Sequence, residues 1–411
     1  MKMKIFFRTF LIVFVLPLFI FSTRSYSQGN YEQEFKHLIL ISLDGFRYDY
    51  LVRGVTPTIS KIASEGVRAA YLQPVFPTST FPNHISIITG LYPTNHGIVA
   101  NKFIDTITNE FFSIGSKEAL DPKWYFGEPF WVTCKKNGVI SASYFWPSSD
   151  LNDSTRNPNY FERYDHNRDY LQRVQGILSW LDLPENQRPS FLTLYFDSPD
   201  TYGHKNGTES VELNKKLTEL DSVISVLIQG LKDRKIYDKT NIIILSDHGM
   251  MNFYPNTLIN YTKFLPKNFA KVINNGAYIF IHPKIGYEDS VVTRLALNSN
   301  NFKFYRSDSL PPVFSCNLSS RLSRYIAIAN CGWLFTEIDE WKNDYVASHG
   351  YDNRCLEMQG IFVAVGPSFK KSYHSIGLRS IDIYPLLCKL FNFKIHHKID
   401  GELINIEHIL K

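Results

Sequence analysis

Aspartate, histidine and threonine residues in five short segments of the sequence could together bind metal ions. The segments are LISLDGF, TSTFPNH, DSPDTYGH, ILSDHG and ASHGYDN. The candidate ligands and nucleophile within them are Asp44, Thr80, Asp200, His204, Asp247, His248 and His349. Oxygen and nitrogen ligands of these kinds suit zinc, and two such ions a few ångströms apart stabilise the attacking and leaving oxygens of a phosphoryl transfer. The set therefore predicts two Zn²⁺ per chain and a phosphoryl-transfer reaction.

Each of these positions, taken alone, has an ordinary structural explanation. A buried Asp at the end of a strand is often a helix N-cap, and Asp200 and His204 lie four apart in a Gly-containing segment that is predicted to be a loop. Thr80 precedes FPNHISIITG, which predicts a helix from about Pro82. Its hydroxyl could be a cap or, with its pKa lowered by the helix N-terminus and a bound zinc ion, a nucleophile. Both interpretations of Thr80 stay open, but five acids and imidazoles in strand-end segments of one chain favour the metal site.

The predicted strands and helices alternate, and the ligands follow strands. The apolar strand 37–43 ends at Asp44, the strand 190–196 leads into 197–200, and the strand 242–246 ends at Asp247. This alternation predicts an α/β fold, a three-layer α/β/α sandwich with a mostly parallel central sheet. Ligands of such sheets gather outside the carboxyl ends of the strands. From about 255 to 340 the alternation weakens, which predicts an inserted cap within one catalytic domain spanning 36–405.

The first 27 residues predict a cleaved secretory signal peptide. Three basic residues among the first eight precede the apolar run 10–21, and small residues at 25 and 27 offer a cleavage site before Gln28. The apolar run is shorter than the roughly 20 residues that a membrane span needs. No cysteine precedes Cys134, so no lipid-bearing N-terminal cysteine is expected. The protein should therefore be secreted or periplasmic, without a membrane span after removal of the signal.

Charge and cysteine content narrow the classes further. The chain has 44 Lys and Arg against 39 Asp and Glu, and four of the bases lie in the predicted signal peptide. The small remaining excess gives no support for a nucleic-acid-binding surface. Of the five cysteines, Cys316 and Cys331 could form a disulfide across an irregular segment, whereas Cys134 and Cys388 lie in apolar helical patterns that predict buried thiols.

Longer motifs surround the candidate residues and occur in a specific order. They are SLDGFR (42–47), PTSTFPNHISIITGLYPTNHGIVAN (77–101), GEPFWVT (127–133), YFWPSSD (144–150), ILSDHGM (244–250) and SHGYDN (348–353). With these motifs the chain resembles the nucleotide pyrophosphatase/phosphodiesterase family of the alkaline phosphatase superfamily, from about Leu38 to the C-terminal helix. The resemblance implies an alkaline phosphatase-like fold. It also implies an exported two-zinc enzyme that hydrolyses phosphodiester or pyrophosphate bonds of nucleoside 5′-phosphate derivatives.

The resemblance assigns a role to each candidate at the metal site. It implies that Thr80 is the nucleophile and forms a covalent phosphothreonine intermediate. The ligands that it implies for the zinc activating Thr80 are Asp44, Asp247 and His248. For the second zinc, which would stabilise the leaving oxygen and later activate water, it implies Asp200, His204 and His349.

The resemblance also assigns substrate contacts. Asn101 matches an amide that hydrogen-bonds a phosphate oxygen, Phe81 and Tyr164 fall where the family stacks a nucleobase between two rings, and Lys102 matches a cation that reaches phosphates. Better-known members carry a Lys where this chain has Ser79. That difference puts a preference for long polyphosphates in doubt, but not diester cleavage.

Three alternative functions stay open. A phosphomonoesterase with the same metals would need an added Arg or a third metal against the extra substrate charge, and the segment around Thr80 offers Phe81 instead. A phospholipid or choline-type phosphodiesterase would need an aromatic and acidic pocket for a cationic group. A non-catalytic binding protein would have no reason to keep the complete ligand set.

Overall fold

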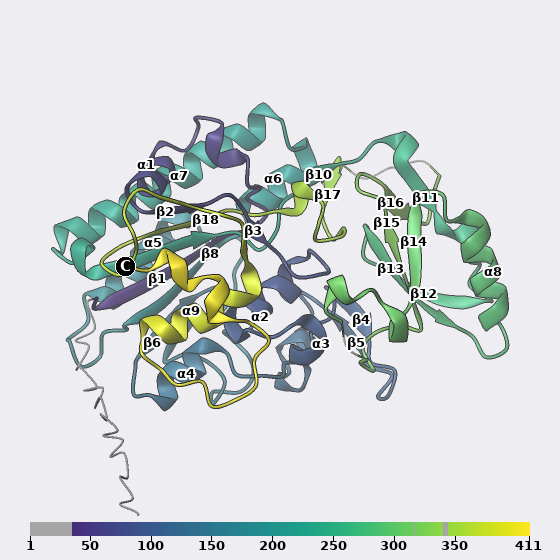
Figure 1. The fold of residues 1–411 in the computed structure, drawn as a ribbon, viewed down its shortest axis with the longest axis horizontal. Coiled ribbons are helices and arrows are strands. Elements are labelled where there is room, and N and C mark those ends of the chain that lie inside the picture. The colour runs from purple at the N-terminus through teal and green to yellow at the C-terminus, as the bar shows by residue number, and fades with distance from the viewer. Residues whose placement is uncertain (1–34, 317, 340–343) are drawn as a thin grey trace, which may run out of the picture. The chain divides into compact units, whose positions relative to one another are not determined.

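The central element of the molecule is an eight-stranded mixed sheet (Figure 1). The computed structural model describes residues 35–411 except 317 and 340–343, so the predicted signal peptide, 1–27, lies outside the described residues. In sheet order the strands are β19 (Tyr373–Ser375), β2 (Val67–Ala69), β18 (Phe362–Val365), β9 (Thr240–Leu245), β1 (His37–Leu43), β8 (Phe191–Phe196), β6 (Ser141–Tyr144) and β7 (Tyr160–Glu162). Only β18 runs antiparallel to its neighbours in this sheet, and every other pairing is parallel.

Helices cover both faces of this sheet. Side chains of β1 alternate between the two faces, and both sets are fully buried. Ile39 and Ile41 pack with α1 (Pro57–Glu65), α5 (Tyr170–Leu181) and α7 (Val211–Asp233). Leu38 and Leu40 pack on the other face with α2 (Thr80–Thr89), α4 (Phe130–Lys136) and α9 (Ile383–Leu390). The predicted α/β sandwich is therefore confirmed.

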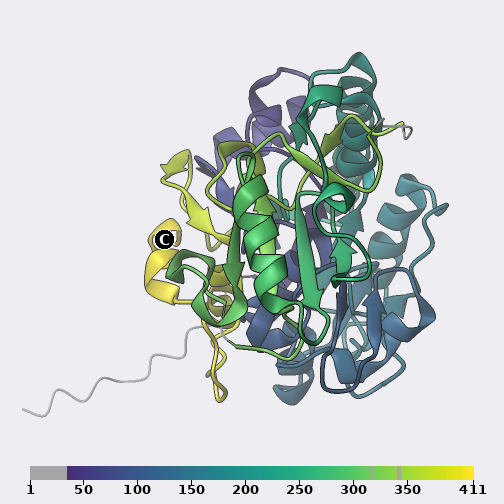
Figure 2. The same ribbon diagram turned by 90° about the vertical axis from the view of Figure 1, so that its right-hand side faces the viewer.

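The segment 255–340 forms most of a second, smaller sheet (Figure 2, where this side faces the viewer). Its antiparallel strands are β12 (Ala270–Asn274), β13 (Tyr278–Pro283), β15 (Tyr325–Ala329) and β14 (Phe302–Arg306), with helix α8 (Glu288–Asn298) between β13 and β14. The core of this region also includes Ile85 of α2 and Phe103 of β4, so the inserted region and the segment around Thr80 share buried apolar contacts.

Among the described residues, four short two-stranded pairings accompany these two sheets. They are β3 (Leu72–Gln73) with β20 (Leu378–Arg379), β4 (Lys102–Ile104) with β5 (Phe111–Ser113), β10 (Met251–Asn252) with β17 (Ala347–Ser348), and β11 (Leu258–Asn260) with β16 (Leu334–Thr336). One short helix, α3 (Pro93–His96), follows α2. Across the described ranges, no helix is both long enough and apolar enough to cross a membrane.

One sequence-based expectation about local structure is wrong. The segment of Asp200 and His204 is a helix, α6 (Ser198–Asn206), and not a loop. Pro199 occupies its first turn, where a missing N–H costs nothing. Gly203 lies in the interior of this helix against Met250. A Cβ at this position would lie 3.2 Å from the Met250 side chain, so there is little room for a larger residue.

The disulfide joins Cys331 to Cys355, and the pairing of Cys331 with Cys316 that the sequence left possible is not formed. Cys331 follows β15, and the fold brings the loop that carries Cys355 beside it, with the two Cα atoms 6.8 Å apart. Cys316 instead directs its thiol to the carbonyl oxygen of Phe314, 3.3 Å away. Cys134 and Cys388 are buried thiols, as predicted.

Candidate active site

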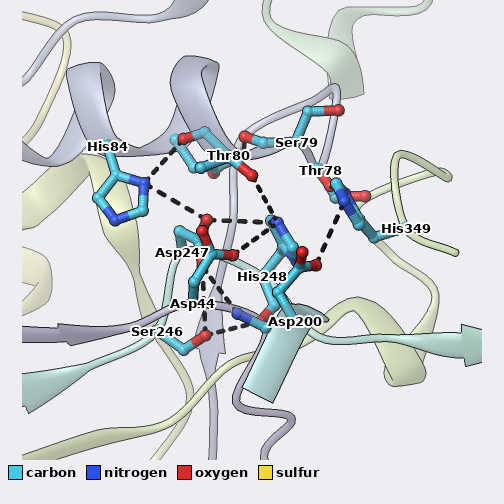
Figure 3. A network of polar contacts seen from close by, with 12 residues as sticks. Asp44, Thr78, Ser79, Thr80, His84, Asp200, Ser246, Asp247, His248 and His349 are labelled. Atoms are coloured by element: carbon cyan, nitrogen blue, oxygen red, sulfur yellow. Dashed lines mark hydrogen bonds and ion pairs between the residues drawn. The ribbon is translucent and has the colours of Figure 1, made fainter. Parts of the chain in front are cut away.

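The predicted ligands gather at the carboxyl ends of three neighbouring strands (Figure 3). Asp44 follows β1, Asp247 and His248 follow β9, and Asp200 lies in α6 directly after β8. Gly45 makes the approach of Asp200 possible. It has a φ of +68°, and a Cβ there would lie 2.9 Å from the Cα of Asp200.

Two further candidates reach this point from other elements. Thr80 is the first residue of α2, and its hydroxyl lies 3.4 Å from Nε2 of His248. His349 comes directly after β17 (Ala347–Ser348), and its ring stacks on that of His248 with centroids 3.8 Å apart. All seven residues named from the sequence thus meet in one place.

One oxygen of each buried carboxylate lacks a hydrogen-bond partner in the described part of the chain. These atoms are Oδ1 of Asp44, Oδ2 of Asp247 and Oδ1 of Asp200. An unpaired buried carboxylate oxygen is costly unless a cation faces it. The three orphaned oxygens are therefore the atoms that a metal ion would need.

Imidazole nitrogens surround these oxygens at the spacing expected of ligands on one ion. Nε2 of His248 lies 3.4 Å from Oδ1 of Asp44 and 3.3 Å from Oδ2 of Asp247. Nε2 of His204 and of His349 lie 3.3 and 3.5 Å from Oδ1 of Asp200. Tetrahedral ligands at zinc bond lengths of about 2.0 Å are themselves about 3.3 Å apart. The donor set thus fits zinc.

The three imidazoles are oriented by backbone carbonyl groups. Nδ1 of His204 lies 2.7 Å from the carbonyl oxygen of Ala347. Nδ1 of His248 lies 2.8 Å from the carbonyl oxygen of Gly249, and Nδ1 of His349 lies 2.9 Å from that of Thr78. A carbonyl can only accept, so each Nδ1 must donate. This fixes the tautomer in which Nε2 carries the free lone pair toward the site, as metal-binding histidines require.

The electrostatics of the site also call for a cation. Burial raises the pKa of Asp44 well above its usual value, and the charges of Asp247 and Asp200 raise it further. Burial lowers the pKa of His248 to about 4 and that of His349 to about 3. Neutral imidazoles cannot balance the clustered carboxylates, whereas a divalent ion can.

The pKa values of Asp200 and His204 shift in the opposite directions from those of Asp44, His248 and His349, because Asp200 and His204 each favour the charged form of the other. Burial alone would raise the pKa of Asp200, but the charges of His204 and His349 lower it below its usual range. The pKa of His204 is raised, because the carboxylate of Asp200 outweighs the effect of burial.

The ligands form two groups that share His248. One group comprises Asp44, Asp247 and His248, and the other comprises Asp200, His248 and His349. His204 joins the second group through its contact with Asp200. His248 thus lies between the two groups.

Cavities open on two sides of the ligand cluster. One, of about 590 Å³, is lined by Asp44, Thr80, Asp200 and the rings of Phe81 and Tyr164. The other, of about 700 Å³, is lined by residues of the inserted region and by Ser79, Asn101, Lys102, His204 and His349. Phe81 and Tyr164 therefore face one cavity, and Asn101 and Lys102 face the other.

Asn101 is tied to the start of α2. Its Oδ1 accepts a hydrogen bond from the N–H of Phe81 at 3.2 Å. That N–H belongs to the first turn, where helix donors lack internal acceptors. The hydrogen bond fixes Asn101 relative to Thr80 and leaves its NH₂ group to point elsewhere.

Two contacting residues were not singled out from the sequence. Tyr195 donates to Oδ2 of Asp44 at 2.6 Å, and Nδ1 of His84 lies 3.4 Å from Oδ2 of Asp247. His84 could have been found, because it is four residues after Thr80 and so lies on the same side of the helix. Tyr195 carries only a weak signal, a polar ring near the carboxyl end of a buried strand.

Comparison with known proteins gives consistent matches. The family model for type I phosphodiesterase/nucleotide pyrophosphatase matches residues 38–352. Venom phosphodiesterase CdcPDE of Crotalus durissus collilineatus is 35% identical over 91% of this chain and 46% of its own length. The chain spans about half the length of the curated relatives that it matches.

Solved structures match over their whole length. Human ectonucleotide pyrophosphatase/phosphodiesterase 5 superposes with a TM-score of 0.87 at 33% identity, covering 91% of this chain and 100% of that one. The murine protein, as an inactive Thr-to-Ala variant in complex with AMP, gives a TM-score of 0.86 at 32% identity, covering 92% and 100%.

Proposed function

The chain belongs to the type I phosphodiesterase/nucleotide pyrophosphatase family, and from that premise we propose that it is an exported two-zinc phosphodiesterase. Its substrates are phosphodiesters or pyrophosphates of nucleoside 5′-phosphates, cleaved through a covalent phosphothreonine. The observation that carries the proposal is the pair of cavities at the ligand cluster, one lined by Thr80, Asp44 and Asp200 and the other by His204 and His349. A diester has two substituents on phosphorus, and each cavity can accept one of them.

The ligand residues divide between two ions in this proposal. Asp44, Asp247 and His248 hold one beside Thr80. Asp200, His204 and His349 hold the other. When bound, the two ions supply Lewis acidity, which favours the alkoxide form of the nucleophile and neutralises charge on the attacking and leaving oxygens.

Thr80 performs the first displacement. Its Oγ1 forms a bond to phosphorus while the bond from phosphorus to the leaving oxygen breaks, and the hydroxyl proton passes to solvent. Water then attacks phosphorus from the opposite side and regenerates the hydroxyl. Asn101 donates a hydrogen bond to a non-bridging oxygen, which stabilises charge as it develops.

The cavity of Phe81 and Tyr164 would hold the nucleobase. Tyr164 is 48% exposed, so part of its ring is open to a ligand. A murine relative is known in complex with AMP, which supports a nucleoside 5′-phosphate as the ligand.

The leaving group would occupy the other cavity. In-line displacement puts it on the side of phosphorus opposite Thr80, and the cavity on the side of His204 and His349 is the place open to it. The Lys102 ammonium, which pairs with no acid among the described residues, could contact an anionic leaving group.

Export is supported by the disulfide. Disulfides persist in oxidising compartments such as the periplasm or the extracellular space, and Cys331 and Cys355 form one. The signal-peptide pattern at residues 1–27 agrees with this.

The deciding experiment compares a nucleoside 5′-aryl phosphodiester with the matching aryl monoester. The diester should be cleaved much faster, and a monoester rate equal to or above it would refute the proposal. Thr80→Ala should abolish turnover, while Thr80→Ser, which keeps a hydroxyl, should retain part of it. Metal analysis should give two zinc ions per chain.

A further inference from the structure

His84 and Tyr195 contact the two carboxylates nearest to Thr80. They come from different elements, α2 and β8, and only 0% and 6% of their surfaces are exposed. We propose that His84 and Tyr195 are positioning residues that orient Asp44 and Asp247 toward the ion beside Thr80. This inference rests on the proposed function, because it presupposes that an ion binds there.

Tyr195 selects which oxygen of Asp44 faces the ion. Its hydroxyl donates to Oδ2 at 2.6 Å, which leaves Oδ1 as the orphaned atom, 3.4 Å from Nε2 of His248. Without the tyrosine hydroxyl, the carboxylate could rotate about its last torsion, which has only broad minima. The hydrogen bond therefore fixes the ligand oxygen.

His84 approaches Asp247 differently, at Oδ2, the orphaned oxygen itself. Its Nδ1 lies 2.8 Å from the carbonyl oxygen of Thr80 and 3.4 Å from Oδ2 of Asp247 (Figure 3). Nδ1 must donate to that carbonyl, and Nε2 lies 2.8 Å from the hydroxyl of Ser42. The ring of His84 is thus held by the backbone of Thr80 and by Ser42, with Nδ1 beside Asp247.

The two positioning residues also hold each other. Their rings pack edge to face with centroids 5.2 Å apart at an angle of 80°. Trp146 packs against the other side of His84 at 5.0 Å and donates its N–H to the His84 carbonyl oxygen at 3.2 Å. This packing restricts both rings, which we infer helps to hold the two carboxylates in place before metal binds.

Asp200 has a different environment. Its orphaned oxygen faces His204 and His349, and within the described part of the chain neither His84 nor Tyr195 forms a hydrogen bond or ion pair with it. Loss of a positioning residue should therefore weaken one ion selectively.

The test measures zinc retained per chain as a chelator is titrated, for the wild type and for Tyr195→Phe. Removal of an outer hydrogen-bond partner commonly lowers metal affinity 10- to 100-fold. The variant should therefore lose one zinc at a chelator concentration about 10- to 100-fold lower, with the second zinc retained as in the wild type. The matched control is Tyr50→Phe, since Tyr50 is equally buried in the same core but its hydroxyl has no hydrogen-bond partner within the described ranges.

Two His84 variants give an independent readout. His84→Leu removes all three polar contacts of the ring, with Thr80, Asp247 and Ser42, while His84→Asn keeps a donor near the position of Nδ1. We expect His84→Asn to restore most of the zinc affinity that His84→Leu loses. If His84→Leu does not fold, Tyr195→Phe alone decides the matter, because it deletes a single oxygen.

The outcomes separate this inference from the proposed function. A wild type that binds no zinc would refute the proposed function itself. A wild type with two zinc ions, together with a Tyr195→Phe variant that holds both equally well, would overturn the positioning role and leave the proposed function intact. An equal loss of zinc in Tyr50→Phe would show a general effect of removing a buried hydroxyl and would also overturn it.

Discussion

Replacing Asn101 with Asp tests the proposed chemistry with a change of one atom. Oδ1 of Asn101 accepts the N–H of Phe81 at 3.2 Å, and an Asp can do the same. The variant should therefore keep the local fold, while the donor proposed for a phosphate oxygen is replaced by a negative charge.

The loss of kcat expected for Asn101→Asp has two parts. Removing a single donor to a developing oxyanion costs about 2.7–4 kcal/mol, or 10²- to 10³-fold in kcat, and Asn101→Ala should lose this much. Like charges about 4 Å apart repel by about 4 kcal/mol at an effective dielectric constant near 20. Screening by solvent and by the two zinc ions reduces this second part, so Asn101→Asp should fall at least about tenfold below Asn101→Ala.

The assay measures hydrolysis of a nucleoside 5′-aryl phosphodiester through the release of the aryl alcohol. Thermal unfolding of each variant is measured in parallel. Asn101→Asp should be the more stable of the two variants, although it is the less active one. Only Asn101→Ala leaves the N–H of Phe81 unpaired, which should lower its free energy of unfolding by about 1 kcal/mol. Asn159→Asp is the matched control, because Oδ1 of Asn159 likewise accepts a backbone N–H, that of Ser141 at 3.1 Å, away from the ligand cluster.

Two results would refute this reasoning. Activity of Asn101→Asp within tenfold of the wild type would mean that residue 101 does not contact the phosphate. Activity of Asn101→Asp above that of Asn101→Ala would mean that the side chain serves only to cap α2.

Three further predictions follow from the same structure. The loop closed by the disulfide spans 24 residues, which corresponds to about 3.4 kcal/mol of stabilisation. Cys331→Ser should therefore lower the unfolding midpoint in non-reducing buffer, while Cys316→Ser, which breaks no bridge, should not. The pKa values of Asp44 and His204 are raised, so both groups retain protons above their usual pH range. Zinc binding near pH 7 should displace these protons, and the number released should grow as the pH falls. Calorimetry in buffers of different ionisation enthalpy measures the protons released, and a release of no protons would contradict the assignment of Asp44 and His204 as zinc ligands. Tyr164→Ala should raise KM for a nucleoside 5′-aryl diester about 5- to 150-fold by loss of base stacking, and an equal rise for methyl aryl phosphate, which has no base, would exclude the stacking role.

The sequence alone determined the fold class and the members of the ligand cluster. Strand periodicity is local, and a strand end directly before Asp44 or Asp247 can be recognised without knowing its neighbours. Because parallel strands present their carboxyl ends at one edge, listing these residues was sufficient to expect them together. The three strands involved, β9, β1 and β8, are indeed neighbours in the sheet.

The tertiary structure alone decided which atoms face one another. Tyr195 reaches Asp44 across 151 positions of sequence, and no periodicity encodes such a contact. The disulfide partner of Cys331 depended on how two loops pack, and the sequence left it open for that reason. The segment of Asp200 and His204 is a helix in which Gly203 packs against Met250, although its composition favours a loop. Residue types and short spacings are properties of the chain, whereas the orientation of a carboxylate or an imidazole depends on partners that only the folded molecule brings within hydrogen-bond distance.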